Sequence, residues 1–138
     1  YAGHASFDMQ QPERGGLELH DGVLTAADLP DIAPQLVFLS ACESGRVRNL
    51  QVAPTLPVHG DGTALAEAFL RAGARAFVGT FYVVEDAGAR MFASTVHTEL
   101  AAGRTLGHAM RTARRALFDA RIADWGNFLL YGDDGLIL

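Results

Sequence analysis

Cysteine and basic residues are scarce in this sequence. Its single cysteine, Cys42, excludes an internal disulfide framework and any metal site built from several thiolates, and it suits a reducing compartment such as the cytoplasm. Lys and Arg number 11 against 16 Asp and Glu, a net charge of −5. Nucleic acid is therefore not expected as a partner, because phosphate binding needs a basic surface. Long hydrophobic runs are also missing, and without the ~20 apolar residues of a membrane span we expect no membrane partner.

Other kinds of site lack their signatures too. No pair of histidines has a metal-ligand spacing with a third partner, so no metal is expected. The Gly-x-Ser-x-Gly elbow of small-molecule α/β-hydrolases is absent. The Gly60-Asp61-Gly62 segment lacks the third glycine and the preceding strand of a phosphate-binding loop. The sequence therefore predicts no cofactor.

What the sequence does contain is typical of one globular domain. It has 138 residues, of which 49% are hydrophobic and 20% charged, within the usual ~100–200 residues per domain. It begins Tyr1-Ala2-Gly3-His4, without an initiator Met or a signal-peptide pattern. We therefore interpret the chain as part of a longer protein, and we expect the first strands of its sheet to be missing from it.

A β-hairpin followed by a helix start is predicted near the beginning of the chain. Leu17 and Leu19 alternate with polar residues, and the Asp21-Gly22 pair that follows tolerates the positive φ of a tight turn. Thr25 then has the position of a helix cap, with Asp28 three residues later as an acidic variant of the capping box.

Hydrophobic spacing predicts an α/β fold. The apolar run over 35–41 is typical of a central parallel strand that is buried on both faces. Further strands are predicted over 76–84 and 127–132, and helices over 63–72, 86–102 and 105–120. Residues 46–62 show no periodicity and are predicted to form a long loop. Strands that alternate with helices in this way indicate a parallel sheet covered by helices.

Two reactive side chains are expected at one edge of this sheet. Sites in parallel sheets form beyond the carboxyl ends of the strands, and Cys42 directly follows the strand over 35–41. If Tyr1-Ala2 ends a neighbouring strand, His4 lies at the same edge. A thiol needs a base to become a nucleophile at neutral pH, and an imidazole can supply it. The spacing alone leaves two interpretations open, a Cys–His dyad or a cysteine that only fills the core.

Five segments of the sequence carry a resemblance to a known family. They are Tyr-Ala-Gly-His-Ala (1–5), Gly-Leu-Glu-Leu-His-Asp-Gly-Val-Leu-Thr-Ala-Ala-Asp-Leu (16–29), Leu-Val-Phe-Leu-Ser-Ala-Cys-Glu-Ser-Gly (36–45), Ala-Phe-Leu-Arg-Ala-Gly-Ala-Arg-Ala-Phe-Val-Gly-Thr (68–80) and Trp-Gly-Asn-Phe (125–128). In this order and spacing they resemble the CHAT family of caspase-like cysteine peptidases, which is related to separases and caspases. The resemblance covers nearly the whole chain, and its most specific part is Ser-Ala-Cys-Glu-Ser-Gly.

The resemblance implies a fold and a set of site residues. The fold is a caspase-like, parallel-dominated sheet flanked by helices, with a small hairpin after the histidine, and residues 1–138 form the C-terminal portion of a single CHAT peptidase domain. His4 is implied as general base and Cys42 as nucleophile. The backbone N–H groups of Ala5 and Cys42 are implied as oxyanion donors. One departure is Ala5, where the family usually has Gly, because Ala resists the positive φ that Gly allows.

The segment over 79–86 resembles the strand that lines the first specificity pocket of separases. Those enzymes carry an Asp where this chain has Val83. Because a buried carboxylate favours a basic substrate residue and a valine does not, we expect an apolar or small residue in the pocket instead. Asp86 is expected to cap the following helix, although it remains an alternative pocket residue, as do Glu85 and Asp61.

The resemblance also implies a function. It is that of a cysteine endopeptidase that cleaves a protein substrate through an acyl-enzyme, as the regulated effector domain of a larger bacterial protein with upstream repeat or sensor domains. An alternative from a different class is a catalytically inactive caspase-like scaffold that only binds partners. The presence of both His4 and Cys42 argues for the peptidase.

Overall fold

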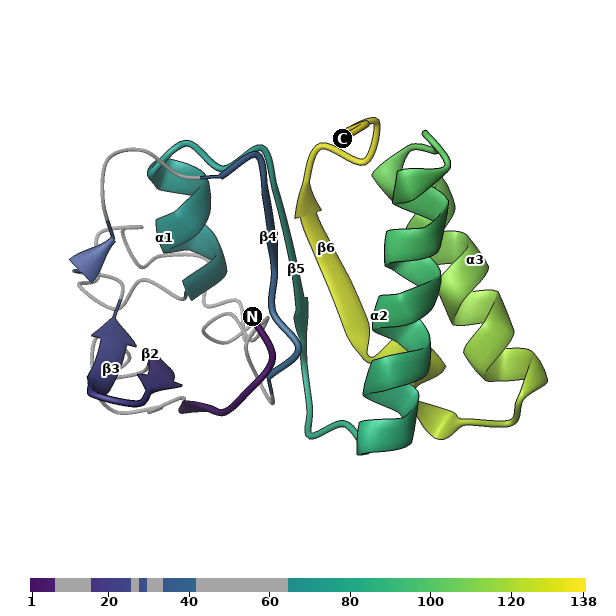
Figure 1. Cartoon of the computed structure of the whole chain (residues 1–138), viewed down its shortest axis with the longest axis horizontal. Coiled ribbons are helices and arrows are strands. Elements are labelled where there is room, and N and C mark those ends of the chain that lie inside the picture. Colours follow the sequence, from purple (N-terminus) through teal and green to yellow (C-terminus); the bar gives the residue numbers. More distant parts are fainter. Residues whose placement is uncertain (7–15, 26–27, 30–33, 42–64) are drawn as a thin grey trace, which may run out of the picture.

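The computed structural model describes residues 1–6, 16–25, 28–29, 34–41 and 65–138 (Figure 1). Within these residues the chain forms strands, α-helices and one 3₁₀ helix, η3. In chain order they are β1 (Ala5–Ser6), β2 (Gly16–Leu19), β3 (Gly22–Thr25), β4 (Leu36–Phe38), α1 (Leu65–Arg71), β5 (Ala76–Thr80), α2 (Asp86–Ala101), α3 (Leu106–Asp119), η3 (Ala123–Gly126) and β6 (Phe128–Gly132).

The central sheet has β5 between β4 and β6. Strands β4 and β5 are parallel, whereas β5 and β6 are antiparallel. The α/β class predicted from the sequence is therefore confirmed, but the expectation that residues 127–132 join a parallel sheet is wrong. The reason is that two helices, α2 and α3, separate β5 from β6. One helix alone would return the chain to the edge of the sheet where β5 begins. The second helix carries it back to the edge where β5 ends, so β6 runs antiparallel to β5.

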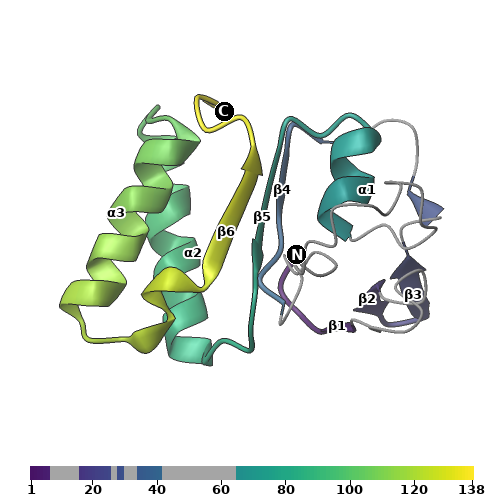
Figure 2. The same cartoon turned by 180° about the vertical axis from the view of Figure 1, so that it is seen from behind.

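Helices cover both faces of this sheet (Figures 1 and 2). One face packs on α2 and α3, with Phe92 and Phe128 stacked at its centre, their ring centroids 3.6 Å apart. The other face packs on α1 and the hairpin through residues such as Val37, Leu39 and Phe77. Alternate residues of β4 and β5 therefore point into different cores, as the two-residue period of a strand requires.

The predicted hairpin is confirmed. Strands β2 and β3 pair antiparallel, and β1 pairs with β2 on the other side. At the end of β3 the Asp28 carboxylate accepts hydrogen bonds from the Thr25 hydroxyl and backbone N–H, at 2.6 and 2.9 Å. Because both bonds favour the charged form, they lower the pKa of Asp28 below its ordinary value. The bond from Thr25 N–H to the Asp28 carboxylate is the half of the expected capping box that the structure describes; the predicted helix start itself falls partly outside the described residues.

The helices agree with their predicted ranges to within about two residues at the ends. Thr105 caps α3, because its hydroxyl accepts a hydrogen bond from His108 N–H at 3.3 Å. Gly103, with φ of 74°, ends α2 in the left-handed conformation that glycine adopts without strain. The strand predicted over 76–84 ends earlier, at Thr80. No helix in the described part of the chain is long and apolar enough to cross a bilayer.

Candidate functional site

The start of the chain runs beside the end of β4. Ala2 and Ser40 form a parallel β-bridge. Three backbone hydrogen bonds fix it: Tyr1 N donates to Phe38 O at 2.9 Å, Ser40 N to Tyr1 O at 2.8 Å, and Gly3 N to Ser40 O at 3.2 Å. Residues 1–3 therefore extend the central sheet next to β4, which places His4 at the carboxyl-end edge of the sheet.

The Tyr1 side chain lies against Gly3, where the backbone bends. The Tyr1 hydroxyl lies 2.7 Å from the carbonyl oxygen of Glu18 and 3.1 Å from that of His4. A Cβ on Gly3 would lie 2.6 Å from Cζ of the Tyr1 ring, a distance that real contacts do not reach. A side chain at this position would therefore push the Tyr1 ring aside, and with it the hydroxyl that contacts the backbone of His4.

A cavity of about 410 Å³ opens at this edge of the sheet. Its described walls come from the N-terminal segment, from the ends of β4 and β5, and from the first turns of α2. The lining residues are Ala2, Gly3, His4, Ser40, Ala41, Thr80, Val84, Asp86, Ala89, Arg90 and Ala93. His4 thus lines a cavity that reaches Ala41, the residue directly before Cys42.

Cys42 itself, and with it the long loop predicted over 46–62, lies outside the described residues. The strand before it has a clear alternation: Phe38 packs toward α2, whereas Val37 and Leu39 pack toward α1. Ser40 continues the series on the α2 side, where it lines the cavity. The structure thus describes the approach to Cys42 as far as Ala41.

The pairing of β1 with β2 determines the direction of the Ala5 backbone N–H. Ala5 lies opposite Leu17, and Glu18 N–H donates to His4 O at 2.9 Å. This is the pattern of a non-hydrogen-bonded antiparallel pair, in which the two residues direct their N–H and C=O groups away from the partner strand. The Ala5 N–H therefore points away from β2.

The residues proposed for the specificity pocket are placed differently from one another. Asp86 lines the cavity, while Val83 is 71% exposed and is not part of the described lining. Asp86 is also not the cap of α2: it is the first helical residue, and Glu85 precedes it as the cap without a side-chain hydrogen bond. Arg90, which the sequence reasoning missed, lines the cavity one turn after Asp86. These two residues place a carboxylate and a guanidinium on the same wall.

Asn127 belongs to the Trp-Gly-Asn-Phe segment, and the sequence alone assigns it no role. Its Oδ1 accepts from the N–H groups of Phe81 and Tyr82 at 3.0 and 2.7 Å, and its Nδ2 donates to the carbonyls of Tyr82 and Val83 at 3.2 and 3.3 Å. The amide thereby holds the loop that leads from β5 to the cavity residues Val84 and Asp86. No local pattern in the sequence signals this contact, because the partners are about 45 residues apart.

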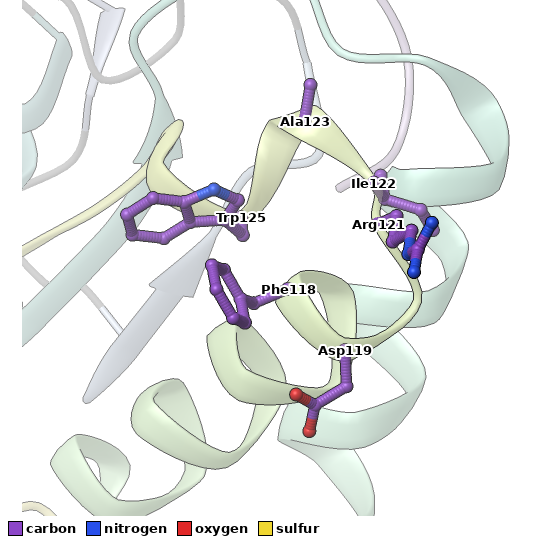
Figure 3. A pocket seen from close by; sticks show the side chains of 6 residues that line it. All are labelled: Phe118, Asp119, Arg121, Ile122, Ala123 and Trp125. Atoms are coloured by element: carbon purple, nitrogen blue, oxygen red, sulfur yellow. The ribbon is translucent and has the colours of Figure 1, made fainter.

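A second cavity, of about 400 Å³, lies where α3 meets η3 (Figure 3). Phe118 and Trp125 face each other edge to face across it, with ring centroids 5.8 Å apart. Its described lining is Phe118, Asp119, Arg121, Ile122, Ala123 and Trp125, which includes no thiol, hydroxyl or imidazole. The cavity beside His4 is therefore the stronger candidate for chemistry. In the described part of the chain no group of three His, Cys, Asp or Glu side chains is arranged to hold a metal ion.

Comparison with known proteins identifies a matching family and a similar curated protein. A family model described as "CHAT domain" matches residues 1–133. The protein "Tetratricopeptide repeat protein 28" of Mus musculus is 32% identical over 123 residues, which make up 84% of this chain and 5% of that protein. The chain therefore spans only a small part of the length of this curated relative.

Proposed function

The chain belongs to the CHAT domain family, and from that premise we propose that it is a cysteine endopeptidase that cleaves a protein substrate. The observation that carries the proposal is the register of the bridge between Ala2 and Ser40. Continued by two residues along each segment, this register would set His4 opposite Cys42. A step of two residues also keeps side chains on one face of a sheet. That face is the one that Ser40 and His4 share with the cavity.

In this mechanism the His4 imidazole removes the proton from the Cys42 thiol, and the thiolate attacks the scissile carbonyl carbon. The tetrahedral intermediate collapses when the amine leaves with a proton from His4, which produces a thioester with Cys42. A water molecule, deprotonated by His4, then attacks the thioester carbonyl. Hydrolysis of the thioester releases the carboxylic acid product, and the proton held by His4 restores the Cys42 thiol.

Two backbone N–H groups are proposed to bind the oxyanion of the intermediate, those of Ala5 and Cys42. Support comes from Ala5, whose N–H points away from β2 by the pairing described above. Oriented donors of this kind need no rearrangement when the charge develops, which is why they contribute strongly to catalysis.

For the residue that precedes the scissile bond we propose a preference for apolar or small side chains over Arg and Lys. The described cavity wall supports this, since the carboxylate of Asp86 is balanced by the guanidinium of Arg90. A basic side chain that loses its hydration there would meet no net negative charge in return. The carboxylate is nevertheless in the wall, so Asp86 remains the residue to test.

The biological setting is also a proposal. The relative's printed name includes tetratricopeptide repeats, which fits a domain that belongs to a larger protein with repeat domains. We propose that such upstream repeat or sensor domains regulate the peptidase, that the protein is bacterial, and that residues 1–138 are the C-terminal portion of its peptidase domain. A free catalytic thiol suits the reducing environment of the cytoplasm.

The second candidate function is an inactive caspase-like scaffold. One observation favours it: no side chain among the described residues makes a hydrogen bond to the ring of His4, so none of these residues orients the proposed base. The scaffold would use the same fold to bind a partner without chemistry.

Labelling of Cys42 separates the two functions. In the intact protein a thiol-alkylating probe should react with Cys42 faster than with a free cysteine of ordinary pKa, about 8.5. The His4→Ala variant should lose this excess rate, because the imidazole no longer removes the proton. A matched His20→Ala variant, which changes a histidine in the hairpin turn, should retain it. Labelling no faster than that of a free thiol would support the scaffold.

A further inference from the structure

Thr80 is a polar residue at the end of an otherwise apolar strand. All five residues of β5 are buried, and Thr80 is 1% exposed. Its hydroxyl donates a hydrogen bond of 2.7 Å to the carbonyl oxygen of Ala41. The same residue lines the cavity beside His4.

Packing alone does not require a threonine at this position. Valine has nearly the same shape and a comparable preference for strands, and it buries no hydroxyl. A buried hydroxyl is costly without a partner, and here the carbonyl of Ala41 supplies one. The hydroxyl therefore has a specific target, and that target is the last backbone group described before Cys42.

The carbonyl of Ala41 belongs to the same planar peptide group as the N–H of Cys42. In a trans peptide these two groups point in opposite directions. A trans peptide whose oxygen is held from the β5 side would direct its N–H toward the other side of β4. That side is occupied by residues 1–3, which lead into His4 and Ala5. Donation to the oxygen also polarises the peptide and strengthens the N–H as a donor.

We propose that Thr80 is a positioning residue that orients the Ala41–Cys42 peptide, so that its N–H binds the oxyanion formed during catalysis. The inference rests on the proposed function. In this role Thr80 acts through the peptide that it holds and not by contact with substrate. Removal of one oxyanion donor typically lowers kcat by about 100- to 1000-fold. Loss of orientation alone should have a smaller effect, of about 10-fold.

The test compares Thr80→Val with Thr80→Ser in the intact protein. Valine keeps the shape and loses the hydroxyl, whereas serine keeps the hydroxyl. One readout is kcat and KM for the best-cleaved member of a library of fluorogenic tetrapeptide amides. The other is the rate at which iodoacetamide alkylates Cys42. Alkylation is a substitution at a methylene carbon that forms no oxyanion, so it reports the dyad without the oxyanion site.

We expect Thr80→Val to lower kcat about 10-fold with KM unchanged, with alkylation within about 2-fold of the unchanged protein. Thr80→Ser should restore kcat. The role of Thr80 would be overturned if kcat is unaffected in Thr80→Val or is lowered in Thr80→Ser as well. It would also be overturned if kcat and the alkylation rate fall together in Thr80→Val. If Thr80→Val does not fold, Thr80→Ala and Thr80→Ser provide the same comparison.

The same measurements distinguish this inference from the proposed function. If the unchanged protein neither cleaves the library nor labels faster than a free thiol, the proposed function fails, and the role of Thr80 fails with it. If the unchanged protein is active and Thr80→Val is equally active, only the role of Thr80 is wrong.

Discussion

Replacement of Asn127 by alanine should destabilise the domain through a loop that lies far from it in the sequence. The substitution removes four hydrogen bonds between the Asn127 amide and the backbone of residues 81–83. Of the two accepted bonds, at 3.0 and 2.7 Å, the first shares the Phe81 N–H with the backbone carbonyl oxygen of Asn127, 3.1 Å away, and alanine keeps that carbonyl. The two donated bonds, at 3.2 and 3.3 Å, go to carbonyls of the exposed residues Tyr82 and Val83, where water can replace the amide.

The expected magnitude follows from this difference. A net contribution of about 1 kcal/mol for the bond from Tyr82 N–H, and little for the shared bond and for the two donated ones, gives a loss of about 1 kcal/mol in the free energy of unfolding. For a domain of this size the melting temperature would fall by about 4 °C. The Thr105→Ala variant is a suitable comparison, because it removes one helix cap at the far end of α3 and should cost about 1 kcal/mol.

Hydrogen exchange of the β5 and α2 amides, measured in the intact protein over a range of urea concentrations, gives these free energies. Asn127→Ala and Thr105→Ala should lose similar global stability, but only Asn127→Ala should remove the protection of the Tyr82 amide without urea. If the Tyr82 amide stays protected in Asn127→Ala, or loses protection equally in Thr105→Ala, the Asn127 amide does not hold the loop and the reasoning is refuted.

Three further results are expected. Cys42→Ala should abolish peptide cleavage while the free energy of unfolding falls by at most about 1 kcal/mol, because the change leaves little cavity; cleavage that persists would show that the nucleophile is another residue. A peptide library should show cleavage after apolar or small residues, and selective cleavage after Arg or Lys that is lost in Asp86→Ala would instead identify that carboxylate as the specificity residue. The lowered pKa of Asp28 means that its bonds to Thr25 contribute to stability above the ordinary value of 3.8 and lose that contribution as the pH falls through the lowered pKa. An NMR titration of Asp28 should accordingly have its midpoint below 3.8 and move back toward 3.8 in Thr25→Ala.

The elements that follow from local pattern were predictable. The hairpin around Asp21-Gly22 and the helices α2 and α3 depend on turn residues, caps and apolar spacing within a few residues of one another. The direction of β6 depends on something longer, the number of helices between it and β5, and the alternation rule alone gave the wrong answer.

The candidate site was predictable only in part. His4 could be placed at the sheet edge because Tyr1 and Ala2 precede it as the end of a strand-like segment, and the bridge to Ser40 has that geometry. The hydroxyl of Thr80 and its acceptor are 39 residues apart, a distance at which no periodicity links two positions. The sequence does contain one indication of this contact, a single polar residue at the end of an apolar strand. A buried hydroxyl at that position needs a hydrogen-bond partner.

The register that would set His4 opposite Cys42 is tested most directly by a crystal structure of the intact protein, in which the distance from the Cys42 Sγ to the nearest nitrogen of the His4 ring can be measured. We predict that both side chains lie on the α2 side of the sheet and within about 7 Å of each other, since dyads without substrate are often looser than the ~2.6–3.2 Å of a working hydrogen bond. Side chains that point to opposite faces of the sheet would contradict the dyad and, with it, the proposed peptidase.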